Sequence, residues 1–284
     1  MRAHSRRVAR RADEHLERRS RDLKHPVHDF LFTYYNFPPT KLKRWLPALG
    51  QDLEVSDEDV AAMPWLVEAP MIRNEGACRL DPKQMPSKAA DLACWVAALC
   101  RAIQDRPPRF RCFGLHEWAM VYRLPCEKIR HQGYELRLSP DQVASVVDSM
   151  TVCCSHYDAY RFFTPDALPL NTLRPTLESR IDLEQGGCLH TNMDLYKWSS
   201  KLWPWIGSDL VGECFDLAWA GRDLDMRASP YDLAHLGYKP VLIETAEGRV
   251  QYEEEQRDLA ARASDLRQRL LEGAAVLAGH GKSR

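Results

Sequence analysis

The chain has 284 residues, of which 45% are hydrophobic and 28% charged, a composition that suits a globular protein of one large domain or two small ones. Its net charge of -1 argues against a protein whose whole surface attracts a polyanion. No apolar run approaches the roughly 20 residues that span a bilayer, and the amino terminus lacks the apolar stretch of a secretory signal. We therefore expect a cytoplasmic protein without membrane contact, whose nine cysteines are mostly reduced. Because no CxxC pair is present, a structural zinc site is not predicted.

The amino-terminal segment is strongly basic. Residues 1–25 contain nine lysines and arginines but only four carboxylates, and residues 6–23 predict a charged helix that ends near Pro26. We expect residues 1–24 to form a helical appendage that is charged on every face and has little to bury. This appendage is either a solvated helix or an arm that contacts nucleic-acid phosphates.

The remaining chain, residues 25–284, predicts one mostly α, bundle-like catalytic domain with at most two or three short strands. The clearest helix spans 87–104, where apolar residues recur every three or four positions. Ser139 and Gln142 flank Pro140 in a capping-box pattern that starts another helix. Proline-rich residues 47–86 predict an irregular segment around one short helix. Further helices are predicted over 27–36, 56–62, 189–202, 208–225 and about 249–277, the last one long and charged, and short strands over 134–138 and 240–244.

Four histidine clusters carry the main functional signal. Each places a histidine within four residues of a carboxylate, a combination that packing does not need but that metal binding and acid/base chemistry do. The pairs are His28 with Asp29, His116 with Glu117, His156 with Asp158, and His190 with Asp194. Helical bundles build metal sites from such side chains, projecting inward from facing helices. Adjacent residues such as His116 and Glu117 diverge on a regular helix, so we expect one of that pair to face solvent.

The spacing within two of these pairs leaves alternatives open. His190 and Asp194 lie four residues apart and share one helical face, so they form either a functional pair or a hydrogen-bonded core pair. His156 and Asp158 diverge by about 200° on a continuous helix. Both of these side chains reach one pocket only where the chain turns.

From these patterns we predict three groups of site residues. The catalytic candidates are His156, Asp158, His190 and Asp194. The candidate ligands of a divalent iron, manganese or zinc ion are His28, His116, Glu117, His156, His190 and Asp194. The substrate-binding candidates are Tyr157, Tyr160, Tyr196, Trp198, Asp225 and Arg227, although the alternating charges around Arg227 are also typical of an ion-paired surface.

Six segments resemble a bacterial family, frequent in actinobacteria, whose members are commonly labelled 3-methyladenine DNA glycosylase. The segments are 25–35, 113–118, 153–165, 169–175, 187–198 and 224–232, and the similarity runs from about His25 to the carboxyl terminus. The resemblance implies excision of alkylated purines, with aromatic side chains stacking an extruded nucleobase and Asp158 or Asp194 stabilising the developing sugar cation. The Gly-rich hairpin by which helix-hairpin-helix glycosylases hold DNA phosphate has no counterpart in this sequence.

The sequence therefore supports three functional hypotheses. The first is an enzyme with a buried His/carboxylate site, expected to be metal-dependent, that oxidises or hydrolyses a small or nucleoside-like substrate. The second is a DNA base-excision glycosylase whose basic amino-terminal segment contacts nucleic acid. The third is a non-catalytic helical protein whose histidines satisfy a polar core.

Overall fold

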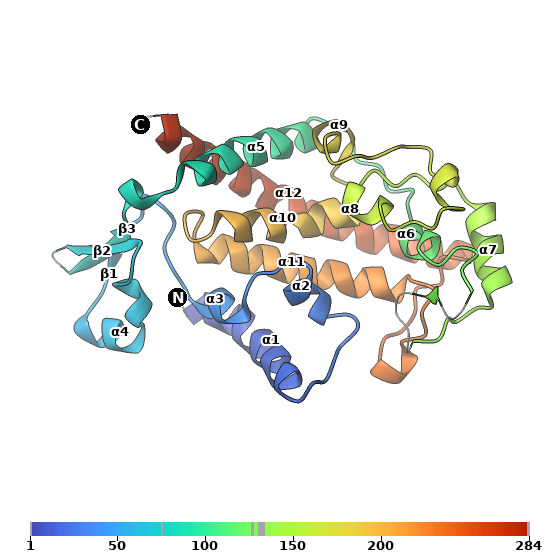
Figure 1. Cartoon of the computed structure of the whole chain (residues 1–284), viewed down its shortest axis with the longest axis horizontal. Coiled ribbons are helices and arrows are strands. Elements are labelled where there is room, and N and C mark those ends of the chain that lie inside the picture. The colour runs from blue at the N-terminus through green and yellow to red at the C-terminus, as the bar shows by residue number, and fades with distance from the viewer. Residues whose placement is uncertain (1, 75, 126–127, 130–133, 283–284) are drawn as a thin grey trace. The chain divides into compact units, whose positions relative to one another are not determined.

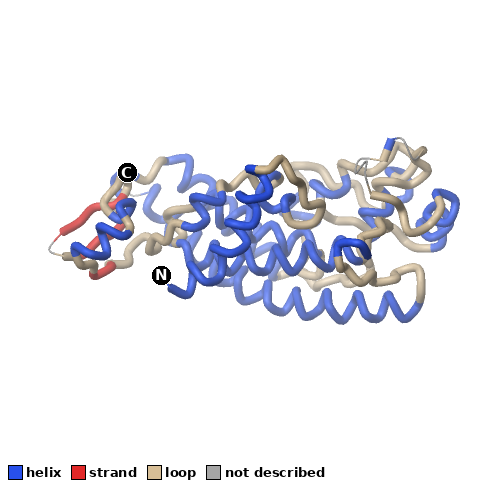
Figure 2. The backbone as a smooth tube through the Cα atoms, turned by 90° about the horizontal axis from the view of Figure 1, so that it is seen from below, coloured by secondary structure: helices blue, strands red, loops and turns tan. Residues whose placement is uncertain are grey.

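The computed structural model describes residues 2–74, 76–125, 128–129 and 134–282. These residues are mostly α-helical, with one small sheet, so the predicted fold class is confirmed (Figures 1 and 2). The chain separates into two compact units. Unit 1 comprises residues 1–101, 194–218 and 265–284, and unit 2 comprises residues 102–193 and 219–264. None of the described helices is both long enough and apolar enough to span a bilayer.

Unit 1 starts with short helices and a small sheet. Its helices before residue 101 are α1 (Arg2–Ser20), α2 (Asp29–Thr33), α3 (Pro39–Lys43), α4 (Asp57–Ala62) and the greater part of α5 (Ser87–Gln104), with 3-10 turns at Pro64–Leu66 and Pro82–Gln84. The helices predicted over 56–62 and 87–104 are thus observed. The helix predicted over 27–36 is shorter than expected, because Asn36 takes a left-handed backbone with φ 52°.

Helix α1 is packed rather than solvated on every face. Val8 and Ala12 are fully buried, as are His4 and His15, and α1 packs against α3. These four residues are spaced three or four apart, so they form one narrow stripe along the helix. The expectation that this helix has little to bury is therefore wrong, because His4 and His15 are buried in addition to Val8 and Ala12.

The guanidinium groups of α1 mostly have carboxylate partners within unit 1. Arg7 pairs with Asp216 through an Nε–Oδ2 contact of 2.9 Å, and Arg11 pairs with the same carboxylate. Arg18 donates to Asp29 at 2.9 Å. Much of the positive charge that suggested a phosphate-binding arm is therefore neutralised inside the protein.

The sheet lies in the segment that we expected to be irregular. Strands β1 (Leu53–Glu54), β2 (Met71–Asn74) and β3 (Ala77–Leu80) form an antiparallel sheet in the order β1-β3-β2. Figure 2 shows it in red. Strands of two to four residues are too short for alternation to be recognised among prolines. Gly76, with φ 84°, supplies the positive φ that a tight turn between β2 and β3 uses.

Unit 2 holds four short helices and long connecting segments. They are α6 (Leu115–Ala119), α7 (Pro140–Ser149), α8 (Tyr157–Tyr160) and α9 (Arg180–Leu183), with 3-10 turns at Leu168–Leu170 and Ala234–Leu236. The predicted capping box at the start of α7 is present, since Ser139 and Gln142 exchange hydrogen bonds. Neither predicted strand forms. Residues 134–138 provide a single bridge, between Leu136 and Tyr231, and the chain at 240–244 turns to begin the last helix.

Three long helices contribute to both units: α10 (Leu189–Leu202), α11 (Ser208–Arg227) and α12 (Ala246–Lys282). The predicted bounds of α10 are confirmed, and those of α11 and α12 extend by a few residues. Within unit 2, α10 and α11 approach closely at Gly221. A Cβ at Gly221 would lie 2.7 Å from Cγ of Met193, so any larger residue here would force the Met193 side chain to move.

We predict that Val8→Asp lowers the free energy of unfolding by about 2 kcal/mol or more, since fully burying a valine is worth about 1.5–3 kcal/mol. Val250 on α12 is 60% exposed, so Val250→Asp is a matched control that should change stability by no more than about 0.5 kcal/mol. Urea unfolding followed by circular dichroism measures both. Two equally mild variants would show that α1 is a separable appendage after all.

Candidate functional site

The centre of unit 2 is a buried carboxylate, Asp225 on α11. Its side chain has no exposed surface. Nε2 of His116, on α6, donates to Oδ1 of Asp225 at 2.7 Å, and Arg222, one turn earlier on α11, donates to Oδ2 at 2.7 Å. Nε2 of His190, on α10, lies 3.9 Å from the same Oδ2. Three elements thus place two imidazoles and one carboxylate around one point.

The histidine rings are in direct contact. The ring of His190 meets that of His116 edge-on, with centroids 4.4 Å apart. On its other side, His190 lies 5.5 Å from the ring of His156. Two of the catalytic candidates, His156 and His190, thus lie close together.

Glu117 is buried beside His116, which corrects the expectation that one of this pair faces solvent. Oε1 of Glu117 accepts a hydrogen bond from Arg222 at 3.1 Å, and only 4% of the residue is exposed. Helix α6 has five residues, all of them buried, so diverging side chains both meet protein. His116 reaches Asp225, and Glu117 reaches the guanidinium that also holds Asp225.

The charges of this cluster do not balance without a further cation. Glu117 and Asp225 supply two negative charges and Arg222 supplies one positive charge. Burial would lower the pKa of His116, but the charge and hydrogen bond of Asp225, with help from Glu117, raise it above its usual value. The cluster therefore favours a positive charge at His116.

The same neighbouring charges shift the pKa values of Asp225 and His190. Burial would raise the pKa of Asp225, but His116, His190 and Arg222 hold it well below its usual range, so the carboxylate is ionised. Burial, and then the neighbouring His116, lower the pKa of His190 to about 3. The His190 imidazole is therefore neutral near pH 7 and keeps a ring nitrogen with a free lone pair.

A second polar network surrounds His156. Nε2 of His156 lies 3.7 Å from Oε1 of Glu184, and Arg180 bridges Glu184, at 2.9 Å, to Asp158. The chain does turn at His156, which was the condition for both side chains to reach one pocket, since His156 has an extended backbone before α8 begins at Tyr157. Asp158 is thus held in ion pairs with Arg180 and Arg161.

Four of the predicted site residues belong to unit 1 and have partners there. Asp194 pairs with Lys197 at 3.2 Å. His28 stacks on His25, with centroids 4.5 Å apart, and burial with the neighbouring His25 lowers the pKa of His28 to about 3. The other two are aromatic: Tyr196 is buried against Tyr35 and Phe215, and Trp198 packs on Trp95.

The last three substrate-binding candidates lie in unit 2 but outside the Asp225 cluster. Tyr157 and Tyr160 are half-buried on α8, where the guanidinium of Arg180 lies over the Tyr157 ring. Arg227 pairs with Glu255 at 2.8 Å and with Asp223 at 3.4 Å. These contacts favour the ion-paired interpretation of the charged run around Arg227.

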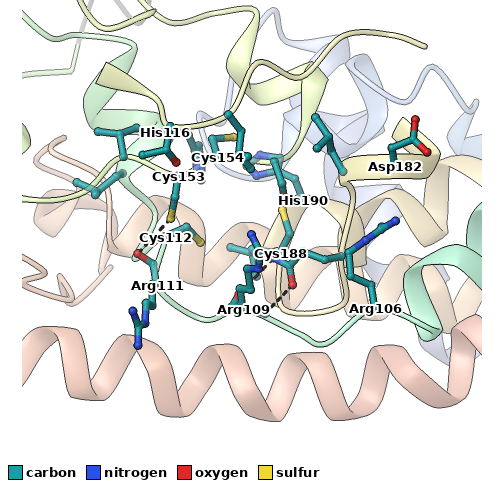
Figure 3. A pocket seen from close by; sticks show the side chains of 18 residues that line it. Arg106, Arg109, Arg111, Cys112, His116, Cys153, Cys154, Asp182, Cys188 and His190 are labelled. Carbon is teal, nitrogen blue, oxygen red and sulfur yellow. Dashed lines mark hydrogen bonds between the residues drawn. The ribbon is translucent and has the colours of Figure 1, made fainter. Parts of the chain in front are cut away.

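A cavity of about 190 Å³ opens onto the two histidines of the Asp225 cluster. His116 and His190 line it together with four thiols, from Cys112, Cys153, Cys154 and Cys188, and with Arg106, Arg109 and Arg111 (Figure 3). Burial raises the pKa of all four thiols, that of Cys188 to about 12, so these side chains are neutral. The thiols are therefore soft, weakly polar walls rather than thiolate ligands or nucleophiles.

The donor set fits a divalent metal ion. One ligand atom each from His116, His190 and Asp225 lies within 4.8 Å of the other two. Atoms that share one ion at bond lengths of 2.0–2.2 Å lie about 3–3.5 Å apart, so the separations among these atoms would have to shorten by up to about 1.5 Å. Oε2 of Glu117 is buried and has no hydrogen-bond partner among the described residues, which adds to the local demand for positive charge.

Sequence reasoning missed the parts of this site that depend on tertiary contact. Arg222 was passed over as one member of an alternating charged run, and Asp225 was predicted as a substrate-binding residue and not as a candidate metal ligand. The one available signal is the spacing of Arg222 and Asp225, three residues apart on a long helix, which places both on one face.

Comparisons with protein-family models, with curated proteins and with solved structures gave no match. No relative therefore supplies a function for this chain. The functional argument rests on the geometry of the Asp225 cluster and on the cavity that opens onto it.

We predict that Arg222→Met lowers the free energy of unfolding by about 3–5 kcal/mol, because it leaves the carboxylates of Glu117 and Asp225 buried without their shared counter-ion. Arg227→Met is the matched control on the same helix, and removing its more exposed ion pair should cost no more than about 1 kcal/mol. Chemical denaturation at pH 7 measures both. Similar small losses in the two variants would mean that Arg222 does not compensate the cluster.

Proposed function

We propose that this protein is a metal-dependent enzyme in which His116, His190 and Asp225 bind one divalent transition-metal ion. The observation that carries the proposal is the convergence of two imidazoles and an ionised, fully buried carboxylate at the wall of a cavity. Two histidines and one carboxylate form the ligand set of non-haem iron(II) oxygenases, and related His and carboxylate sets hold catalytic zinc. When bound, such an ion supplies Lewis acidity and open coordination positions for a substrate or water.

The protonation states support this role. His190 has a ring nitrogen available near pH 7 because its pKa is about 3. His116 binds a proton more tightly than an ordinary histidine, and that proton offsets the same negative charge that would attract a metal ion. Metal binding at His116 would release that proton, and the ion would supply positive charge in its place.

Arg222 and Glu117 position the ligands. Arg222 fixes one oxygen of Asp225 by a 2.7 Å hydrogen bond and is itself held by Glu117. Such outer contacts set the orientation of metal ligands and often change metal affinity by 10–100-fold. The ring of His156 packs near that of His190, with centroids 5.5 Å apart.

The glycosylase hypothesis has less support from these contacts. A carboxylate that stabilises a sugar cation must be available to the substrate, whereas Asp158 is already tied to Arg180 and Arg161. Several guanidinium groups of α1 are paired with carboxylates of unit 1. We therefore favour metal-dependent oxidation or hydrolysis of a small substrate.

We predict that the protein binds about one equivalent of iron(II), manganese(II) or zinc(II), and that His190→Gln weakens this binding at least about tenfold. Stability should change little, because the nearest carboxylate of His190 is at 3.9 Å, too far for a strong hydrogen bond. Metal content after loading and desalting is measured by mass spectrometry, and anaerobic titration gives the affinity.

His235→Gln is the control, since His235 is an exposed histidine of unit 2 outside the cavity. It should retain full metal binding. If wild type retains no metal, or if His190→Gln and His235→Gln bind it equally, the proposed metal site is wrong.

A further inference from the structure

Three arginines line the cavity on the side opposite the histidines. Figure 3 shows Arg106, Arg109 and Arg111 along one side of the cavity and His116 with His190 along the other. Asp182 is the one carboxylate among the described lining residues. The cavity is therefore strongly positive at its arginine end.

This positive charge is largely uncompensated within the described part of the chain. No described carboxylate forms an ion pair with Arg109 or Arg111, and both residues are exposed. Arg106 donates to the carbonyl oxygens of Ile181, at 2.9 Å, and Glu184, which fix its position without neutralising it. In Figure 3 the Arg111 side chain extends away from the histidines. Arg109 and Arg106 are thus the guanidinium groups best placed to meet a ligand.

Arg109 stands on a backbone that is held firmly. Its N–H donates to the side-chain oxygen of Gln185 at 2.8 Å, and the Gln185 amide donates back to the Arg109 carbonyl at 3.2 Å. Gly187 packs so closely here that a Cβ would lie 2.4 Å from that carbonyl. The side-chain amide of Gln256 also holds Gly187 in place, by donating to its carbonyl at 2.6 Å. An exposed arginine on a clamped segment is a preorganised feature, which is typical of a binding site.

The field of the arginines reaches the cavity interior. Burial raises the pKa of the Cys153 thiol, while the positive charges of Arg109 and Arg111 oppose that rise. Between the two ends lie the side chains of Cys112 and Cys188 (Figure 3). A ligand that spans the cavity therefore meets positive charge, then a weakly polar middle, and then the histidines.

The volume limits the ligand's size. About 190 Å³ is smaller than the roughly 300–1,000 Å³ of sites that take drug-sized molecules. A small compound with one anionic group and a short apolar body fills such a space. A whole nucleotide does not fit within it.

We propose that the substrate is a small organic anion, a carboxylate or a phosphate ester, whose oxyanion binds Arg109 and Arg106 while its reacting end faces His116 and His190. The planar guanidinium group matches both oxyanions by paired hydrogen bonds. This inference rests on the proposed function, since the reacting end is defined by the histidine and Asp225 cluster. It adds the chemical class of the substrate.

The test measures anion binding to metal-free protein by isothermal titration calorimetry at low salt. The probes are benzoate, inorganic phosphate and benzamide, which has the size of benzoate without its charge. We expect benzoate or phosphate to bind, benzamide to bind at least about tenfold more weakly, and Arg109→Gln to weaken anion binding at least about tenfold. Whichever of benzoate and phosphate binds more tightly shows whether the substrate's oxyanion is a carboxylate or a phosphate.

Arg262→Gln is the matched control. Arg262 is an exposed residue of α12 in unit 2 outside the cavity, and its loss changes the net charge equally, so anion binding should be retained. The inference is overturned if neither anion binds, if benzamide binds as tightly as benzoate, or if Arg109→Gln and Arg262→Gln behave alike. It is also overturned if a short DNA duplex binds with dependence on Arg109 while both small anions do not.

These outcomes are independent of the metal. Anion binding is measured on metal-free protein, so it does not depend on whether a metal ion is bound. A protein that binds the anion but no metal contradicts the proposed metal site and leaves the anion site standing. The reverse result removes only the anion site.

Discussion

The candidate site in unit 2 depends on compensation of the buried negative charge of Asp225. A fully buried carboxylate costs several kcal/mol unless partners restore what water supplied. His116 and Arg222 supply that compensation, each through a hydrogen bond of 2.7 Å. Since His116 comes from α6 and Arg222 from α11, the requirement fixes the position of one element against the other. The third neighbour, His190, is placed by α10, which can approach α11 closely because residue 221 is glycine.

The parts of the fold that could be predicted are those in which local signals act alone. Helices 87–104 and 189–202 are long and periodic, and their bounds were found from the sequence. The capping box at Ser139 needs only side chains that are close in sequence. The small sheet escaped prediction because its strands are two to four residues long and pair across a proline-rich segment. The burial of α1 escaped prediction because its stripe has only two aliphatic residues with a histidine at each end, and hydrophobic patterns ignore histidine.

In the candidate site, too, local sequence patterns reveal some features, and tertiary packing decides the others. Proximity of a histidine and a carboxylate in sequence singled out His116, His156 and His190, which the structure brings into one row of rings. Sequence proximity could not give the partner of each histidine. His116 pairs with Asp225, 109 residues away, and not with the adjacent Glu117. A pairing across that separation is decided by how α6 and α11 pack, which no spacing rule contains.

The two ends of the site carry uncompensated charges of opposite sign. The Asp225 cluster has an excess of negative charge that a proton or a metal ion offsets, while the arginine end has positive charge without a carboxylate partner among the described residues. Direct pairing would neutralise both ends, yet the neutral thiols of Cys112 and Cys188 lie between them. A protein that keeps opposite charges apart across one cavity retains their fields for a bound molecule. If both proposed sites bind their ligands, an anion at one end and a cation at the other would each stabilise the folded unit, because each would remove an uncompensated charge.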